Sequence, residues 1–247
     1  MLIEIGGWRL LTDPTFDEPG RTYRFGWSRK VAGPAIAARD VGSIDAVLLS
    51  HDHHADNLDD AGRALLPLAR SVITTRTGAA RLGGNARGLA PWATTQLDSP
   101  GRPSIAITAT PCRHGPPGTH LIVGDVIGFS LEWAGQRRGT FWISGDTVMF
   151  AGVRHVAGRL RVGTEILHLG GVRFPITGPL RDTMTATDAV GITRLLRPHT
   201  VVPIHYEGWS HFQQDRSEIE RAFAESEPEI RDCVRWIAIG GSLDVGV

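Results

Sequence analysis

The side chains best suited to chemistry lie in one short internal run, His51-Asp52-His53-His54-Ala55-Asp56-Asn57. Neutral imidazole and carboxylate groups together suit borderline divalent metals such as zinc, and also manganese or iron. A solvated polar loop is the alternative, but such a loop more often carries Lys, Glu and Gly than three histidines. We therefore predict a metal site whose candidate ligands are His51, His53, His54 and Asp56, with Asp56 also a candidate catalytic residue.

Three further candidate ligands, His114, Asp146 and His205, each follow a predicted strand. Taken singly, a histidine after a strand is more often structural, and an aspartate after glycine is more often a turn or cap residue. Strand ends on one edge of a sheet, however, meet at a common crevice. We expect these side chains to gather there with the run at 51–57 and to bind two metals, with an aspartate bridging them.

Two such ions, roughly 3.5–4 Å apart, hold a bridging hydroxide and polarise the substrate oxygen. The bound water then has a pKa of about 7, so no Ser, Cys or Thr nucleophile is needed. The sequence accordingly contains no Gly-x-Ser-x-Gly element, and no P-loop or GxGxxG in a strand–helix context. Cys112 lies two residues before His114; we interpret it as a small buried residue, with a reactive thiol as the alternative.

Several polar or aromatic residues beside these motifs are candidates for a substrate pocket: Arg113, Arg173, Tyr206, Trp209 and His211. Either of the two arginines is suited to a phosphate or carboxylate group, and surface packing is the alternative for each residue. His168, which precedes Gly170-Gly171, is either a core histidine or a residue that lines the pocket or contacts a metal ligand.

The elements that must position these residues are short strands mixed with helices. Strands are predicted at residues 45–50, 71–75, 105–110, 126–133, 140–144, 166–169, 200–204 and 234–239. The runs at 45–50 and 166–169 are interpreted as buried, and those at 126–133 and 140–144 as an antiparallel pair. Residues 2–5 and 8–11 form a hairpin on Gly6-Gly7, and residues 15–40 form a long surface loop. Helices are expected at 58–70, where Pro67 ends the helix, at 186–197, and from a capping box at Ser217 and Glu220 to about 226. This pattern predicts an α/β fold of two sheets with helices outside them.

Composition narrows the class of protein. The 247 residues fit one domain spanning 1–247. The 26 basic and 26 acidic residues give a net charge of zero, which does not favour non-specific binding of nucleic acid. Two widely spaced cysteines form no disulfide framework or thiolate zinc site. Without a signal peptide or an apolar run of membrane-spanning length, we expect a cytoplasmic protein with a small-molecule substrate, and a homo-oligomer stays open.

Together these residues resemble the metallo-β-lactamase superfamily, and most closely its branch of ascorbate-phosphate lactonases and N-acyl-phosphatidylethanolamine phospholipase D enzymes. Leu10-Leu-Thr-Asp-Pro14 looks like the first strand and turn of that branch, and residues 50–59 occupy the place of its His-x-His-x-Asp-His motif. His114 matches the third histidine, Asp146 the bridging aspartate and His205 the last histidine. The resemblance implies an αββα sandwich of two mixed β-sheets with flanking helices and one or two zinc ions at one edge.

The run departs from the family motif by one inserted residue. His51 with either His53 or His54 fits one metal, and Asp56 fits the other. Asn57 stands where a second-metal histidine is usual, and an amide is a poorer zinc ligand than imidazole. The second metal position is therefore the point at which this chain differs from its family.

The function predicted from the sequence is hydrolysis of a small ester, lactone or phosphoester by metal-bound hydroxide. A nucleic-acid phosphodiesterase is one alternative, against which the zero net charge argues. The other is a non-catalytic scaffold of the same fold, supported by the altered motif.

Overall fold

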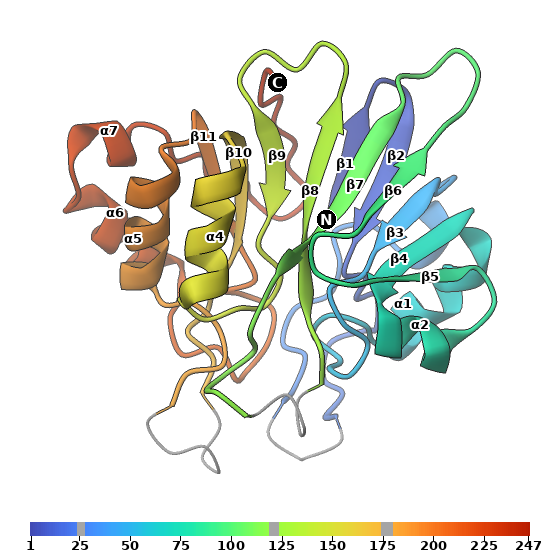
Figure 1. Ribbon diagram of the computed structural model, residues 1–247. Coiled ribbons are helices and arrows are strands. Elements are labelled where there is room, and N and C mark those ends of the chain that lie inside the picture. Colours follow the sequence, from blue (N-terminus) through green and yellow to red (C-terminus); the bar gives the residue numbers. More distant parts are fainter. Residues whose placement is uncertain (24–27, 119–123, 174–179) are drawn as a thin grey trace.

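Two β-sheets packed face to face form the centre of the molecule, with helices on both outer faces (Figure 1). The computed structural model describes residues 1–23, 28–118, 124–173 and 180–247. The predicted αββα sandwich is confirmed. Part of the predicted loop at 15–40, namely residues 24–27, lies outside the described residues.

The first sheet has five strands in sequence order. These are β1 (Leu2–Ile5), β2 (Trp8–Thr12), β3 (Ala46–Leu48), β4 (Ser71–Thr75) and β5 (Ala86–Leu89). β1 and β2 are antiparallel and the remaining pairs are parallel. The predicted hairpin turns on Gly6 and Gly7, whose φ angles of 52° and 86° are readily adopted only by glycine.

The second sheet has six strands in the order β11-β10-β9-β8-β7-β6. These are β6 (Thr94–Leu97), β7 (Ile105–Pro111), β8 (Ile127–Trp133), β9 (Thr140–Ile143), β10 (Val162–His168) and β11 (Thr200–Ile204). Strands β6 to β9 pair antiparallel, whereas β9, β10 and β11 are parallel. Pro203 is accommodated because β11 is at the edge of this sheet, where a missing N–H breaks no central ladder.

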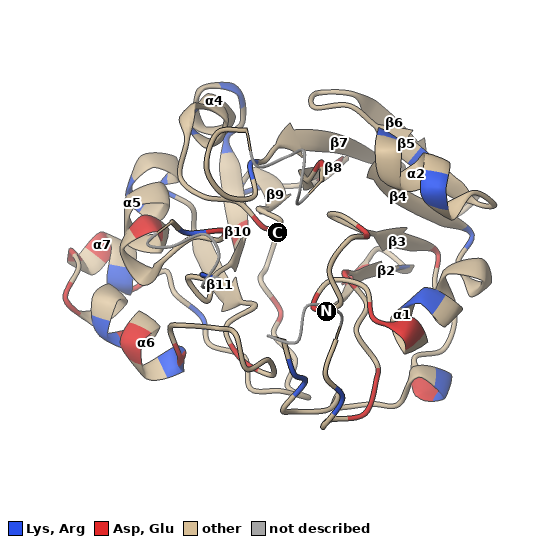
Figure 2. Cartoon of the chain, turned by 90° about the horizontal axis from the view of Figure 1, so that it is seen from below, with Lys and Arg blue, Asp and Glu red and all other residues tan. Residues whose placement is uncertain are grey.

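Three apolar clusters hold these layers together. The cluster between the sheets contains the fully buried Leu48, Ile107 and Phe129. A second cluster lies between the six-stranded sheet and α4 (Ala151–Arg159), α5 (Ala186–Leu196), α6 (Arg216–Ala224) and α7 (Pro228–Arg231). A third packs the five-stranded sheet against α1 (Asp60–Leu65) and η2 (Leu66–Leu68), and α2 (Arg76–Leu82) lies on the same side (Figure 1). Positive and negative residues are interspersed along α1, α6 and α7 (Figure 2).

Several boundaries differ from the sequence prediction. The predicted helix at 58–70 is α1 followed by η2, because the Pro67 ring is compatible with a short 3-10 turn but ends the α-helix. The capping box of α6 is formed by Asp215 and Glu218, not by Ser217 and Glu220. The predicted strand at 234–239 is wrong: among the described residues only Val234 pairs, in one bridge to Val201.

Among the described residues, six elements were not predicted: α2, α4, α7, β5, β6 and the short 3-10 turn η1 (Ala38–Asp40). The N-cap residue of α4 is Phe150, which provides no side-chain cap, and α2 buries only Gly78, so neither helix has a clear sequence signal. Strand β5 exposes Arg87 and Gly88 and pairs with the fully buried β4. Such elements are held by their neighbours more than by their own propensity.

Candidate metal centre

The candidate ligands follow the carboxyl ends of four strands from both sheets. His51 follows β3, His114 follows β7, Asp146 follows β9 and His205 follows β11. The structure brings them into two groups of three, His51–His54–His114 and Asp56–Asp146–His205, whose donor atoms in each group lie within 4.8 Å of one another. The predicted convergence at one edge is therefore present.

The first group presents three imidazole nitrogens to one point. The Nδ1 atom of His54 lies 3.0 Å from the Nε2 atoms of both His51 and His114. His114 must carry its proton on Nδ1, since that atom lies 2.6 Å from the Asp182 carbonyl oxygen, which can only accept. Its Nε2 therefore directs a lone pair at His54. Such a second hydrogen bond is how proteins orient a metal-binding imidazole.

Burial keeps these imidazoles neutral. Desolvation lowers the pKa of His54 to about 4, with a further contribution from His114. Desolvation also lowers the pKa of His51 and His114, that of His51 well below its ordinary value. Three neutral imidazoles with converging nitrogens form an electron-rich cradle that fits a divalent cation.

The second group combines two carboxylates and one imidazole. His205 Nε2 lies 3.5 Å from Asp56 Oδ2 and 3.6 Å from Asp146 Oδ2, and its Nδ1 lies 3.4 Å from the Leu169 carbonyl oxygen. Asp146 is only 1% exposed, yet neither of its carboxylate oxygens has a hydrogen-bond partner among the described residues. Buried carboxylate oxygens without donors are costly, and a divalent cation is one group that would satisfy them.

The charges of this group depend on one another. Burial raises the pKa of Asp146. Burial also opposes ionisation of Asp56, but His211 and His205 outweigh it and hold the Asp56 pKa well below its ordinary value. Burial likewise opposes protonation of His205, whose pKa is nevertheless raised to about 9 by Asp146 and Asp56. The His205 imidazole and the Asp56 and Asp146 carboxylates thus stabilise one another's charged forms.

A strained backbone conformation and buried neighbouring side chains hold the second donor group in place. His205 adopts φ 60°, a left-handed conformation that is rare for a non-glycine residue and is typical of functional sites. Asp13 accepts a hydrogen bond from the Ser50 N–H at 2.7 Å and lies 3.2 Å from His168 Nε2. His168 packs beside His205, with their ring centroids 5.4 Å apart. His168 therefore lies behind a candidate ligand.

The structure places His54, not His53, in the first group. His53 is an exposed residue outside both groups, with Nδ1 3.7 Å from Asp52 Oδ1. The extra residue of the run therefore lies between His51 and His54, and Ala55 is the ordinary spacer before Asp56. In the turn that follows, the N–H groups of Asn57 and Leu58 both donate to the His54 carbonyl oxygen. Asn57 is fully buried beside Ser50 and belongs to neither group.

His211 contacts the second group although the sequence indicated only a pocket role for it. Its Nε2 atom lies 2.9 Å from Asp56 Oδ2, and its Nδ1 atom lies 2.9 Å from Ser28 Oγ. The signal in the sequence was a histidine six positions after His205. Nothing local indicated that Ser28, far away in sequence, would lie against it.

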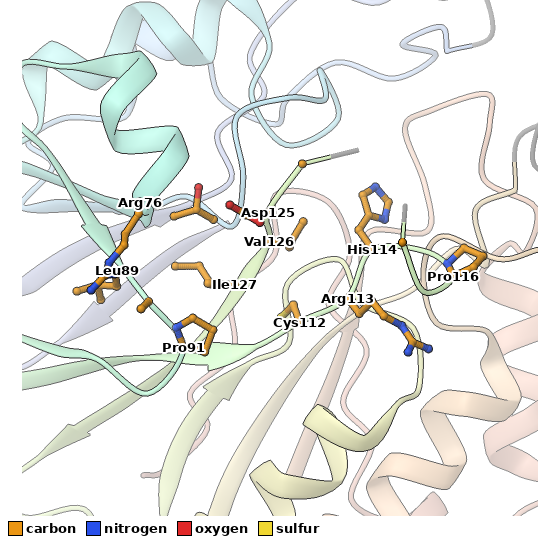
Figure 3. A pocket seen from close by; sticks show the side chains of 14 residues that line it. Arg76, Leu89, Pro91, Cys112, Arg113, His114, Pro116, Asp125, Val126 and Ile127 are labelled. Atoms are coloured by element: carbon orange, nitrogen blue, oxygen red, sulfur yellow. The ribbon is translucent and has the colours of Figure 1, made fainter. Parts of the chain in front are cut away.

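A pocket of about 290 Å³ adjoins His114 (Figure 3). Its wall includes the apolar Leu89, Pro91 and Ile127, and the polar Arg76 and Asp125.

Of the five candidate pocket residues, all within the described part of the chain, only Arg113 lines this pocket, and His211 contacts Asp56 instead. The Nε of Arg113 donates to the Gly115 carbonyl oxygen, and its guanidinium stacks over Phe150 at 4.9 Å. Arg173 is exposed. Tyr206 and Trp209 do not line this pocket, because apolar packing buries both: Tyr206 in the core beneath α4–α7, and Trp209 in ring contact with Tyr23.

Cys112 also lines the pocket, but as a thiol. Its Sγ donates to the Ser144 carbonyl oxygen at 2.8 Å. Desolvation raises the pKa of the thiol well above its ordinary value, so the nucleophilic thiolate is disfavoured. This environment matches the interpretation of Cys112 as a small packed residue.

An αββα sandwich with two groups of histidine and aspartate donors at one edge is the architecture of the metallo-β-lactamase fold. The chain belongs to the β-lactamase superfamily domain family, whose model matches residues 8–206.

Relatives and solved structures agree with this assignment. The chain is 28% identical over 196 residues to a UPF0173 metal-dependent hydrolase of Pelotomaculum thermopropionicum, covering 76% of this chain and 78% of that protein. Its fold matches an isothiocyanate hydrolase from Delia radicum gut bacteria with a TM-score of 0.78, at 22% identity over 98% of this chain and 93% of the other. A possible metal-dependent hydrolase from Veillonella parvula matches with a TM-score of 0.79, at 19% identity over 97% and 93% of the two chains. Among the described residues, no helix has the length and apolar character needed to cross a bilayer.

Proposed function

We propose that this protein is a metal-dependent hydrolase acting on a small ester, lactone or phosphoester. The observation that carries the proposal is the pair of donor groups, one of which contains two buried Asp146 carboxylate oxygens with no hydrogen-bond partner among the described residues. Relatives of similar length named metal-dependent hydrolases support it.

Each group has residues suited to one ion. His51, His54 and His114 would hold the first through neutral imidazoles. Asp56, Asp146 and His205 would hold the second. Divalent ions bound there supply a Lewis acid and lower the pKa of a bound water to about 7. The ionised Asp56 supplies negative charge at neutral pH, and His114 faces the neighbouring pocket.

The size and lining of the pocket beside His114 indicate which class of substrate would fit. A volume of about 290 Å³ accepts a small molecule, and the walls at Leu89, Pro91 and Ile127 favour an apolar part beside the scissile group. Arg113 is suited to a carboxylate or phosphate, although its guanidinium already stacks on Phe150. The resemblance to the lactonase and phospholipase D branch favours lactones and phosphodiesters. Isothiocyanates belong in the same panel because a hydrolase of that name shares the fold.

The test is to purify the protein, measure bound metal by mass spectrometry, and assay lactones, phosphodiesters, aryl esters and isothiocyanates. We expect up to two divalent ions per chain and an activity that chelation removes and added metal restores. Asp146→Asn should lose metal and activity together. His53→Ala, a matched histidine variant outside both groups, should retain both.

A protein that binds no metal under any loading condition would refute the proposal. Full metal occupancy with no turnover across the panel would favour a non-catalytic scaffold instead. Salt-dependent binding of RNA or DNA would favour a nucleic-acid phosphodiesterase.

A further inference from the structure

The segment after β11 brings a second imidazole to Asp56. His211 is 5% exposed, and its Nε2 lies 2.9 Å from Asp56 Oδ2. The same carboxylate oxygen lies 3.5 Å from His205 Nε2. Two imidazoles from one loop therefore face the oxygen that the second donor group offers to a cation.

The surroundings of His211 are compatible with the tautomer that a metal ligand needs. Its Nδ1 lies 2.9 Å from Ser28 Oγ, a hydroxyl that can accept the ring proton. Nε2 then carries a lone pair directed at a carboxylate oxygen, which has no proton to give. Two lone pairs 2.9 Å apart repel unless a positive charge lies between or beside them. A proton on Nε2 or a bound cation is therefore required.

The second donor group lacks an imidazole that the motif would ordinarily supply. Asn57 occupies that motif position, but it is buried with its amide nitrogen 3.5 Å from Ser50 Oγ and belongs to neither group. Without a replacement, the second group offers two carboxylates and only one imidazole, His205. His211 would restore two nitrogen and two oxygen donors, a set that suits four-coordinate zinc.

Backbone pairing holds His211 in this position. The Val31 N–H donates to the Gly208 carbonyl oxygen at 2.8 Å, and the Ser210 N–H donates to the Arg29 carbonyl oxygen at 2.9 Å. Residues 28–31 and 208–211 thus lie side by side. The backbone that carries His211 is thus hydrogen-bonded to the segment that carries Ser28. Such pairing holds the imidazole in a fixed position, as a preorganised ligand requires.

We propose that His211 is the fourth protein ligand of the second metal, in place of the histidine that Asn57 replaces in the motif. This inference rests on the proposed function, because it assumes that the second donor group binds a metal. It also explains how the chain can retain a second ion despite the change at position 57.

The experiment is cobalt substitution followed by proton NMR of the hyperfine-shifted, solvent-exchangeable ring N–H signals, each reporting one cobalt-bound imidazole. We expect five such signals in the dicobalt wild type, from His51, His54, His114, His205 and His211. Cobalt titration of His211→Ala should show an unchanged first site and a second site weakened by more than about 100-fold, beyond the usual effect of an outer-shell partner. His53→Ala should bind both ions with wild-type affinities.

The outcomes separate the two proposals. A wild type that binds two cobalt ions but shows four signals would overturn the assignment of His211, leaving it a hydrogen-bonded partner of Asp56. The assignment also fails if the wild type binds a single ion through the first group. A wild type that binds no cobalt would refute the proposed function itself. The wild-type count decides the question even if His211→Ala does not fold.

Discussion

Replacement of Asp59 by alanine should be among the most destabilising single changes in this protein. The Asp59 carboxylate is buried and accepts four hydrogen bonds. The donors are the N–H groups of Phe16, Asp17 and Gly62 and the Lys30 ammonium, at 2.7–2.8 Å. One contact caps helix α1, two hold the loop after β2, and the fourth neutralises a lysine that is only 3% exposed. The carboxylate therefore joins three segments near the donor groups.

The magnitude follows from what Asp59→Ala leaves behind. Removing one partner of a buried ion pair costs about 3–5 kcal/mol, because the remaining Lys30 ammonium loses its counterion. Loss of the helix cap adds about 1 kcal/mol. The Phe16 and Asp17 amides add less than their full penalty, since the loop can relax toward water. We expect a loss of about 4–6 kcal/mol, a large fraction of the ~5–15 kcal/mol typical of a domain.

The assay is urea unfolding followed by circular dichroism and by tryptophan fluorescence. The ring of Trp209 lies 5.4 Å from Lys30 Nζ, so its emission reports locally. The matched control is Lys30→Met, which leaves Asp59 with three amide donors and should cost less than Asp59→Ala. The double variant should regain about 2 kcal/mol relative to Asp59→Ala, because no unpaired ammonium remains. A loss below about 1.5 kcal/mol for Asp59→Ala, or no gain in the double variant, would refute this reasoning.

Three other predictions follow from single features of the structure. Burial raises the pKa of Glu165 from 4.5 to about 8, so the folded protein keeps a proton that the unfolded chain releases. Stability should therefore fall by about 3–5 kcal/mol as pH rises from 5 to 8, and urea unfolding of Glu165→Gln across this range should lack that slope. A Cβ atom at Gly62 would lie 1.9 Å from the Pro14 carbonyl oxygen, so Gly62→Ala should lower Tm by several degrees in a thermal scan. The control is Gly83→Ala, which has open space around it and should lower Tm only through the positive φ of that residue. Chelation of bound metal should also lower Tm, because Asp146 loses the cation that satisfies its oxygens, and a metal-loaded protein whose Tm ignores the chelator would contradict the proposed second site.

Much of the sheet architecture can be predicted from local sequence. The apolar runs that become β3, β4, β7 and β8 are bounded by turn residues, and strand burial follows directly from such a pattern. Because the metal-binding residue types follow those runs, their meeting at one sheet edge was also predictable. Elements such as β5 and β6 were not, since their exposed polar residues become strands only through pairing with neighbours. Residues 234–239 show the reverse case, an apolar run with a single bridge to β11.

Local sequence indicates that the candidate ligands are histidine and aspartate. Tertiary contacts decide which of these residues join the two donor groups. Histidine and aspartate at positions 51–56 already predicted a metal site. His54, not His53, lies in the first donor group, and its carbonyl oxygen accepts the N–H groups of Asn57 and Leu58 in the turn that follows. The approach of His211 to Asp56 depends on pairing between segments about 180 residues apart. Non-local backbone pairing leaves no periodic signal in a sequence, and it appears only when the chain is folded.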